Sequence, residues 1–284
     1  CDTAAVRQAV EDCDVVFHLA GSVKALQPET MLKTNVEGTR VLATACAARP
    51  TPPTLVLTSS LAAAGPSPAG QPRREGDRCQ PVSVYGRSKR DAELVLEEFA
   101  QRLPASVVRP PIVFGPRDQG MLAMFKAIRR TRMHLLPGYR RRTYSLIHAA
   151  DLVEALLRVA TQGSRLAAAS SEGGHQGYYY VADDQQLTYG QLGSMITRAL
   201  GGRWVLNLPM PEWSVWLSAW VNDQISRRRG EAHVLNIDKA REATAGSWTC
   251  SAEKIERELG FHTAAPLAER MQETASWYRA EGLL

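Results

Sequence analysis

Thr54-Leu55-Val56-Leu57-Thr58-Ser59-Ser60 is an apolar run that ends in two serines, and it decides the fold together with the later segment Tyr85-Gly86-Arg87-Ser88-Lys89. A short apolar run of this kind predicts a buried strand. The later segment opens a predicted helix over 84–103, on which Tyr85 and Lys89 lie one turn apart on the same face. The chain therefore places a phenol and an ammonium group on the helix that comes after a buried strand.

The same alternation of strand and helix continues on both sides of this run. Further buried strands are predicted at 14–21 and 105–114, and further helices at 2–11 and 28–48. Strands that alternate with helices form a parallel sheet with helices on both faces. We therefore predict an α/β fold with a doubly wound, Rossmann-like parallel sheet.

After residue 118 the strand-helix pattern loosens, and predicted helices become more frequent than strands. We predict a main domain over 1–118 and a smaller, mostly helical carboxy-terminal cap over 119–284. Segments near 143–162 and 177–183 are expected to return to the main domain.

Composition and charge exclude several classes of protein. With 284 residues and 44% hydrophobic content, the chain can bury a sizeable core. Its net charge of +5 comes in short arginine clusters without interleaved aromatic residues, which argues against nucleic-acid binding. No apolar run is long enough to span a membrane, and no signal peptide is present. The Trp-rich stretch 213–220 is interpreted as a packed helix, with a membrane-surface or partner-facing helix as the alternative.

The cysteines are scattered and odd in number, and they are Cys1, Cys13, Cys46, Cys79 and Cys250. No Cys-x-x-Cys pair occurs, which argues for a reducing compartment and against a disulfide framework or a zinc site. We therefore expect a cytoplasmic protein without a metal site.

Tyr85 and Lys89 predict the chemistry of the site. A lysine ammonium beside a phenol favours the phenolate and lowers the pKa of the phenol. Such a phenol can pass a proton to or from a substrate oxygen while a hydride moves at the carbon. A nearby serine hydroxyl can hold that oxygen. The pattern predicts a hydride-transfer site, and the alternative is a helix-surface Tyr with an unrelated Lys.

Several segments, in a fixed order, resemble a known family. The order of elements resembles the extended short-chain dehydrogenase/reductase superfamily, the group of NAD-dependent epimerases and dehydratases, from residue 1 to about residue 160. The segments are Phe17-His18-Leu19-Ala20-Gly21, Thr34-Asn35-Val36-Glu37-Gly38-Thr39, Leu57-Thr58-Ser59-Ser60, Tyr85-Gly86-Arg87-Ser88-Lys89, Val108-Arg109-Pro110-Pro111-Ile112-Val113-Phe114-Gly115 and Ile147-His148-Ala149-Ala150-Asp151-Leu152.

The resemblance implies a role for each matching residue. Tyr85 would be the general acid/base, and Ser60 would hold the substrate oxygen, with Ser59 as the fallback. Lys89 would hydrogen-bond the nicotinamide ribose and lower the pKa of Tyr85. The cofactor would be NAD or NADP, bound by the main domain, with a small-molecule substrate in the cap. The cofactor contacts that the resemblance implies are Ala20, Gly21, Lys24, Asn35, Ser59, Tyr85, Lys89, Pro111, Ile112 and Val113; for Asn35 the alternative is a polar residue that fixes its helix to the sheet.

One element of the family is absent from the sequence. The family begins with a strand, a Gly-x-x-Gly-x-x-Gly turn and a helix, whose amino terminus binds the cofactor pyrophosphate. Gly70 and Gly76 lie in a loop and do not form this motif. The resemblance implies that the first strands, about 60 residues, are missing, together with the residue that selects NAD or NADP. We expect the chain alone to bind cofactor poorly and to be unstable.

Signals for a sugar-nucleotide substrate come from three positions. UDP-galactose epimerases place an Arg where this chain has Tyr144, and Arg142 two residues earlier is a candidate substitute. Arg257 matches a second diphosphate-binding Arg, with an exposed helix Arg as the alternative. These positions imply a sugar nucleotide or a related polar alcohol.

Other signals favour a hydrophobic substrate. The run Ser-Ser-Leu-Ala-Ala-Ala-Gly-Pro at 59–66 resembles 3β-hydroxysteroid dehydrogenases and dihydroflavonol-reductase-like enzymes. Two arginines that converge on a diphosphate would favour the sugar nucleotide. An apolar pocket lined by Trp213, Trp216 and Trp220 would favour the hydrophobic alcohol or ketone.

Two further hypotheses concern the class of the protein and its assembly. A non-catalytic NAD(P)-binding sensor on the same fold is the alternative to an enzyme. A homodimer through the helices 28–48 and 84–103 is possible.

Overall fold

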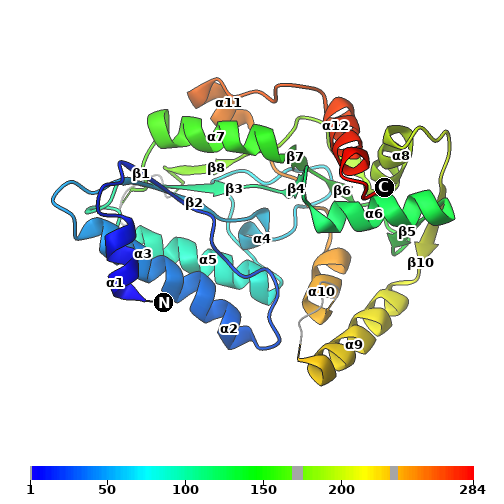
Figure 1. The fold of residues 1–284 in the computed structure, drawn as a ribbon, viewed down its shortest axis with the longest axis horizontal. Coiled ribbons are helices and arrows are strands. Elements are labelled where there is room, and N and C mark those ends of the chain that lie inside the picture. Colours follow the sequence, from blue (N-terminus) through cyan, green and yellow to red (C-terminus); the bar gives the residue numbers. More distant parts are fainter. Residues whose placement is uncertain (1, 168–174, 231–235) are drawn as a thin grey trace.

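A sheet of four parallel strands forms the centre of the fold (Figure 1). The computed structural model describes residues 2–167, 175–230 and 236–284, so Cys1 lies outside the described residues. The strands, in the order in which they pair, are β1 (Val15–His18), β2 (Thr54–Thr58), β3 (Ala105–Arg109) and β8 (Tyr178–Tyr180). The predicted α/β fold with a parallel sheet is confirmed.

Helices cover both faces of this sheet (Figure 1). One face carries α1 (Thr3–Ala9), α3 (Gly38–Ala47) and α5 (Val84–Glu97), and the other carries α7 (Ala149–Gln162) and α11 (Glu253–Leu259). Strand β2 shows why both layers form. Leu55 and Leu57 pack in a cluster with Leu96 of α5, whereas Val56 packs in a cluster with Val159 of α7. Successive side chains of a strand point to opposite faces, so an apolar run needs cover on both.

The rest of the molecule is built around three helices and short strand pairs. The helices are α6 (Gln119–Thr131), α8 (Tyr189–Ala199) and α12 (Leu267–Ala280), and their shared core includes Phe125 and Tyr278. The strand pairs are β4 (Ile112–Phe114) with β7 (Leu146–His148), β5 (Met133–Pro137) with β10 (Leu206–Met210), and β6 (Thr143–Tyr144) with β9 (Leu187–Thr188). In Figure 1, α9 (Glu212–Arg229) and α10 (Ile237–Ala245) project from this part below the sheet.

Several boundaries differ from those predicted. The segment 28–48 is not one α-helix but α2 (Pro28–Leu32), a π-helical turn (Lys33–Glu37) and α3. The segment 105–114 is not one strand either. Two prolines at 110–111 lack the N–H that a ladder needs, so the segment divides into β3 and β4. Helix α5 ends at Glu97 instead of residue 103. The short α4 (Leu61–Ala64), the β5–β10 pair and α10 were not predicted.

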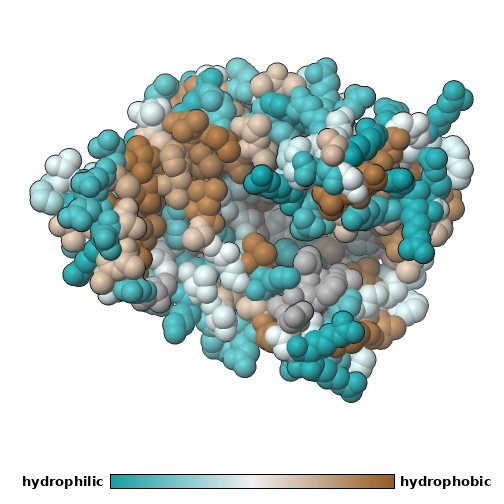
Figure 2. Space-filling model, viewed as in Figure 1, coloured by the Kyte–Doolittle hydropathy of each residue, from teal (hydrophilic) through white to brown (hydrophobic). Residues whose placement is uncertain are grey.

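Strand β1 lies at one edge of the described sheet. Phe17 and Leu19 beside this edge are exposed. Figure 2 shows hydrophobic residues gathered over the same end of the molecule. Among the described residues, no helix combines the length and the apolar character that crossing a membrane requires.

Candidate active site

Ser60, Tyr85 and Lys89 come together at the carboxyl end of strand β2. Ser60 caps the short α4 directly after β2 by accepting from the Ala62 N–H at 3.1 Å, and its hydroxyl lies near that of Tyr85 in the first turn of α5. Lys89, one turn further along α5, is buried and its Nζ donates to the Thr58 carbonyl at 3.0 Å. The structure thus brings the three residues that the sequence predicts as catalytic into one place.

A close approach between α4 and α5 sets the position of Tyr85. Gly86 follows Tyr85, and a Cβ atom at this glycine would lie 2.4 Å from the Ala62 carbonyl oxygen of α4. Only glycine therefore lets the start of α5 pack against the turn that carries Ser60. Ser83 caps α5 by accepting from the Gly86 N–H at 2.8 Å.

Helix α10 holds the start of α5 from the other side. The two carboxylate oxygens of Asp238 accept from the backbone N–H groups of Val84 (2.7 Å) and Tyr85 (3.1 Å). The Nζ of Lys239 lies 5.2 Å from the centre of the Tyr85 ring, a cation–π distance. These contacts satisfy N–H groups that have no partner within the helix, and they place α10 over the candidate proton donor.

The pKa of Tyr85 moves in the direction opposite to the prediction. Burial of the phenol raises this pKa to about 12; the hydrogen bond with Ser60 opposes the rise, and the Glu242 carboxylate of α10 adds to it. The expectation that Lys89 lowers the pKa of Tyr85 is therefore wrong for this arrangement. Burial disfavours the charged form of any acid, and Lys89 directs its Nζ to the Thr58 carbonyl.

A polar cradle beside Lys89 fits the ribose and nicotinamide end of a dinucleotide. A Cβ atom on Gly21 would lie 3.1 Å from the Nζ of Lys89 and 3.2 Å from Oδ1 of Asn35, so the glycine keeps these groups accessible. The buried Oγ1 of Thr58 has no hydrogen-bond partner among the described residues. A bound molecule would have to supply the missing donor or acceptor for this hydroxyl. Burial lowers the pKa of Lys89, which the Glu93 carboxylate opposes.

Asn35 holds the loop after β1 against α5. It lies in the π-helical turn, a feature that often marks functional sites. Its Oδ1 accepts from the Ser22 N–H at 2.6 Å, and its Nδ2 donates to the Ser22 carbonyl and to Ser88 Oγ. These bonds fit the alternative interpretation of Asn35, a polar residue that fixes its surroundings, and they place Gly21 beside Lys89.

Ser59 has a different partner from Ser60. Its hydroxyl donates to Glu93 at 2.5 Å, and Glu93 is also bound by Arg109 at 2.7 and 2.8 Å. Through Ser59, this buried ion pair is joined to the turn that carries Ser60. The sequence does not predict a role for Glu93 or Arg109. For Glu93, the only sequence signal is its position one turn after Lys89 on the predicted helix.

The other predicted cofactor contacts lie along the same edge of the sheet. Ala20 is exposed directly after β1, and Lys24 is exposed three residues beyond Gly21. The half-buried residues Pro111, Ile112 and Val113 follow β3. No hydrogen bond from the side chain of Lys24 is present among the described residues.

Of the three predicted substrate-binding residues, Arg142 and Tyr144 line one cavity, and Arg257 does not. Arg142 is buried and pairs with Glu212 at 2.5 Å. Tyr144 is buried in the core that also contains Phe125, and burial raises its pKa to about 12. Arg257 lies on α11, on the face of the sheet opposite α5, with its side chain 69% exposed (Figure 1). The expectation that two arginines converge on a diphosphate is therefore not met.

A cleft beside the start of α5 separates the loop after β1 from α9 and α10. It has a volume of about 240 Å³. Its lining combines apolar and charged side chains: Val23, Ala25, Leu26, Pro28, Met31, Val84, Asp223, Arg227, Asn236, Ile237, Asp238, Lys239 and Arg241. The apolar part lies along the loop after β1 and the start of α2, and the polar part comes from α9 and α10.

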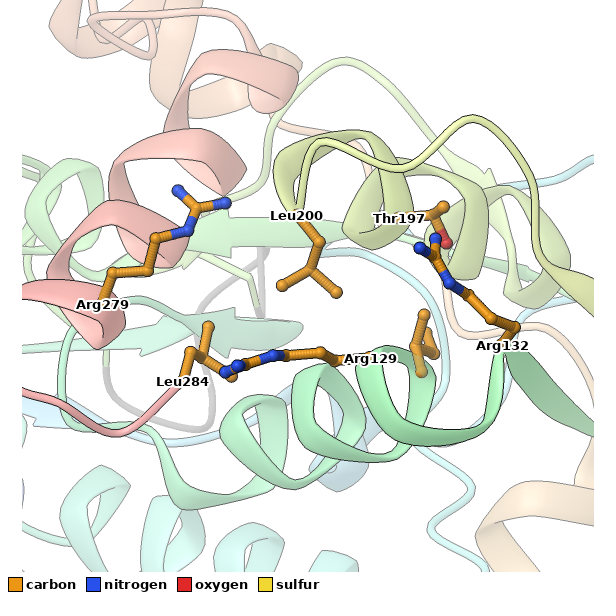
Figure 3. A pocket seen from close by; sticks show the side chains of 7 residues that line it. Arg129, Arg132, Thr197, Leu200, Arg279 and Leu284 are labelled. Atoms are coloured by element: carbon orange, nitrogen blue, oxygen red, sulfur yellow. The ribbon is translucent and has the colours of Figure 1, made fainter.

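The pocket in Figure 3 lies elsewhere, between α6, α8 and α12. Arg129 and Arg132 stand at the carboxyl end of α6, and Arg279 donates to the Ala199 carbonyl at the end of α8 (2.5 Å). Carboxyl ends of helices carry partial negative charge, which these guanidinium groups neutralise. The cluster is accounted for by this structural role.

Comparison with known proteins agrees with the order of these elements. Residues 1–169 match the family described as the NAD dependent epimerase/dehydratase family. The chain belongs to this family. Members of the NAD dependent epimerase/dehydratase family bind NAD or NADP, and an oxidoreductase or epimerase site agrees with the residues gathered around Tyr85.

Two curated relatives align with almost the whole chain. The ceramide reductase of Caulobacter vibrioides is 26% identical over 280 residues, which cover 99% of this chain and 78% of that protein. The uncharacterized protein y4nG of Sinorhizobium fredii is 28% identical over 284 residues, which cover 98% of this chain and 66% of that protein.

Solved structures of the same fold include sugar-nucleotide enzymes. UDP-glucose 4-epimerase of Thermotoga maritima superposes with a TM-score of 0.75 at 19% identity, over 99% of this chain and 82% of that one. The dTDP-glucose 4,6-dehydratase DesIV of Streptomyces venezuelae, solved with NAD, gives a TM-score of 0.72 at 19% identity, over 100% and 80%. At these identities the likeness shows the fold.

Proposed function

We propose that the protein is an NAD(P)-dependent reductase that converts a ketone of a hydrophobic substrate to an alcohol. When bound, the reduced nicotinamide supplies the hydride, which adds to the carbonyl carbon. The Tyr85 hydroxyl gives its proton to the carbonyl oxygen, and the Ser60 hydroxyl holds that oxygen. Lys89, with Gly21 beside it, forms the place for the nicotinamide ribose, and Asn35 positions Gly21 through the loop after β1. The grouping of Ser60, Tyr85 and Lys89 at one strand end is the observation that carries this proposal.

The protonation of Tyr85 fits its role as a proton donor. Burial raises the pKa of this phenol to about 12, so it keeps its proton at neutral pH and is suited to donate to a carbonyl oxygen.

The apolar side of the cleft supports a hydrophobic substrate. Val23, Leu26 and Met31 line the cleft beside α5, and the two candidate diphosphate arginines do not converge. The relative from Caulobacter vibrioides is a ceramide reductase. We therefore propose a long-chain, lipid-like ketone as the substrate class.

A sugar nucleotide is the second candidate, favoured by one cavity. Tyr139, Arg140 and Arg141 line a space of about 310 Å³ together with Tyr189. Exposed arginines beside aromatic rings can hold a nucleotide diphosphate. The cavity is, however, bordered by Arg142, whose guanidinium already forms an ion pair with Glu212 and is therefore not free to bind a diphosphate.

A substrate panel separates the two candidates. The purified chain is incubated with reduced nicotinamide cofactor in large excess and either 3-keto sphingoid lipids in mixed micelles or UDP-4-keto sugars. Cofactor oxidation with the lipid ketones alone supports the proposal. Oxidation with the sugar nucleotides alone would overturn the hydrophobic assignment and leave the hydride-transfer site in place.

Cofactor binding by the 284-residue chain is expected to be weak. A glycine-rich turn at a helix amino terminus, where backbone N–H groups meet the pyrophosphate charge, is not found among the described residues. We expect NAD(H) dissociation constants above the micromolar range in isothermal titration calorimetry. A submicromolar constant would contradict this prediction.

The Glu242 carboxylate is expected to set the alkaline limit of activity. Its negative charge contributes to the raised pKa of Tyr85, so Glu242→Gln should lower that pKa. Reduction needs the protonated phenol and therefore declines as pH rises through the pKa. The alkaline decline of kcat should move to lower pH in Glu242→Gln. Glu98→Gln, on the exposed end of α5, should leave the profile unchanged and serves as the control.

A further inference from the structure

Helix α9 exposes several large apolar side chains at the surface. Ala219 and Ser226 are the only buried residues of this helix, and they lie on the same side of it, away from these exposed side chains. On the other side, the exposed fractions are 67% for Trp213, 50% for Leu217 and 53% for Trp220. A surface helix of a globular protein normally shows the reverse arrangement.

The large exposed apolar residues lie on one side of the helix, which they share with Gln224 and Arg228. At about 100° per residue, Trp213, Leu217 and Trp220 fall within roughly 60° of one another around the helix axis. Val221 and Ile225, each 41% exposed, extend the face on one side. Contiguous apolar surface of this kind marks an interaction site.

Exposed arginines flank this face at both ends. Arg228 and Arg229 end the helix, and within the described part of the chain neither pairs with a carboxylate. At the other end, Glu212 contacts the turn that carries Arg140 and Arg141, which are exposed. Figure 2 shows hydrophilic residues at the lower end of α9 next to hydrophobic residues along the helix.

We propose that α9 docks this protein on the surface of an anionic lipid bilayer. Tryptophan rings favour the boundary between headgroups and acyl chains, and arginines at both ends would meet anionic headgroups. The outward face (Trp213, Leu217, Trp220, Val221 and Ile225) would lie in the boundary region, with α9 parallel to the membrane plane.

A second copy of the chain fits this face less well. Two copies related by a two-fold axis would pair their α9 helices in antiparallel fashion. Arg228 and Arg229 of one copy would then approach Arg140 and Arg141 of the other. Like charges at both ends of such a contact disfavour it, whereas anionic lipid neutralises both ends.

Docking in this orientation would bring the cleft to the membrane. Asp223 and Arg227, on the flank of α9 next to the outward face, line the cleft beside the start of α5. A molecule leaving the lipid surface would therefore meet the cleft directly. The docking proposal itself does not depend on the identity of the substrate.

Vesicle binding tests the proposal. The purified chain is centrifuged with vesicles of phosphatidylcholine alone or of phosphatidylcholine and phosphatidylglycerol in equal parts. We expect at least about tenfold stronger partitioning to the anionic vesicles, reduced by added salt. The triple variant Trp213→Ser, Leu217→Ser, Trp220→Ser should lose at least about tenfold in partitioning.

Two further variants separate the contribution of the arginines from that of the apolar side chains of α9. Arg228→Gln with Arg229→Gln should reduce the preference for anionic vesicles by about tenfold and leave the apolar face intact. Leu94→Ser with Val153→Ser removes exposed apolar side chains from α5 and α7 and should bind vesicles as the parent does. Circular dichroism checks that each variant remains folded.

Three results would overturn the proposal. They are failure to bind either kind of vesicle, equal binding by the parent and the triple variant, and a concentration-dependent dimer that the triple variant abolishes. The last result would assign the face to a second copy of the chain.

Discussion

Tyr85→Phe is expected to lower kcat for carbonyl reduction by about 10²- to 10⁴-fold, because the variant loses the proton that the proposed reaction transfers to the substrate oxygen. The ring remains, so the cation–π contact with Lys239 and the packing of α5 against α4 persist. Binding of the reduced cofactor, measured by calorimetry at high cofactor concentration, should change by less than about twofold. Loss of kcat without loss of binding is the signature of a proton donor.

A matched variant makes this result specific. Tyr139→Phe removes a hydroxyl from a tyrosine that is 72% exposed and does not line the cleft beside α5, so kcat with the lipid ketone should stay at the parent level. Unchanged turnover in Tyr85→Phe would refute the catalytic assignment. Absence of turnover in the parent chain, with NAD(P) binding retained, would instead favour the alternative of a non-catalytic sensor.

The sheet could be predicted from the sequence because its signals are local. Leu55, Val56 and Leu57 form an uninterrupted apolar run, and each is buried in β2. The pair Tyr85 and Lys89 was predicted for the same reason, since a four-residue spacing on a helix fixes their common face. Their proximity to Ser60 depended on the resemblance to the family, and the structure places them together.

The contacts of α10 could not be predicted, because they join residues far apart in the chain. Asp238 accepts from the N–H groups of Val84 and Tyr85, which precede it by more than 150 residues. No periodic pattern of residues in 237–245 predicts that this segment caps the start of another helix. Burial is the main cause of the raised pKa of Tyr85, and Glu242 of the unpredicted helix adds to it, so the missed helix accounts for part of the error about this pKa.

Asp151 illustrates the same limit. An Asp at the start of a helix is a common N-cap, but in α7 His148 occupies that position, and its ring accepts from the Ala150 N–H. Asp151 lies in the first turn and pairs with Arg270 of α12 at 2.7 Å. A carboxylate near a helix start fits either role, and only the packing of a distant helix decides between them.

Glu93→Gln is expected to produce the largest loss of stability. Glu93 and Arg109 are both almost fully buried and joined by two hydrogen bonds, with Arg90 as a further partner at 3.0 Å. Removing the carboxylate charge leaves the guanidinium buried and uncompensated, which costs about 3–5 kcal/mol in the free energy of unfolding. Thermal unfolding should shift down by roughly 10 °C.

The same substitution elsewhere on this helix provides the control. Glu98→Gln breaks an exposed ion pair with Arg40 and should cost less than about 1 kcal/mol. Glu93→Met combined with Arg109→Met removes both buried charges and should lose less stability than Glu93→Gln alone, because neither charge is left without its partner. A loss below about 1 kcal/mol in Glu93→Gln would contradict the structural role assigned to the pair.

The buried pair also connects stability to the candidate active site. Glu93 accepts from Ser59, the neighbour of Ser60, and lies one turn after Lys89 on α5. Loss of the carboxylate therefore weakens the junction between the end of β2 and the helix that carries Tyr85. We expect Glu93→Gln to lower kcat below the unfolding temperature while the alkaline decline of activity stays in place, because Glu93 is not among the groups that shift the pKa of Tyr85. A shifted pH profile would instead make Glu93 part of the proton-transfer machinery.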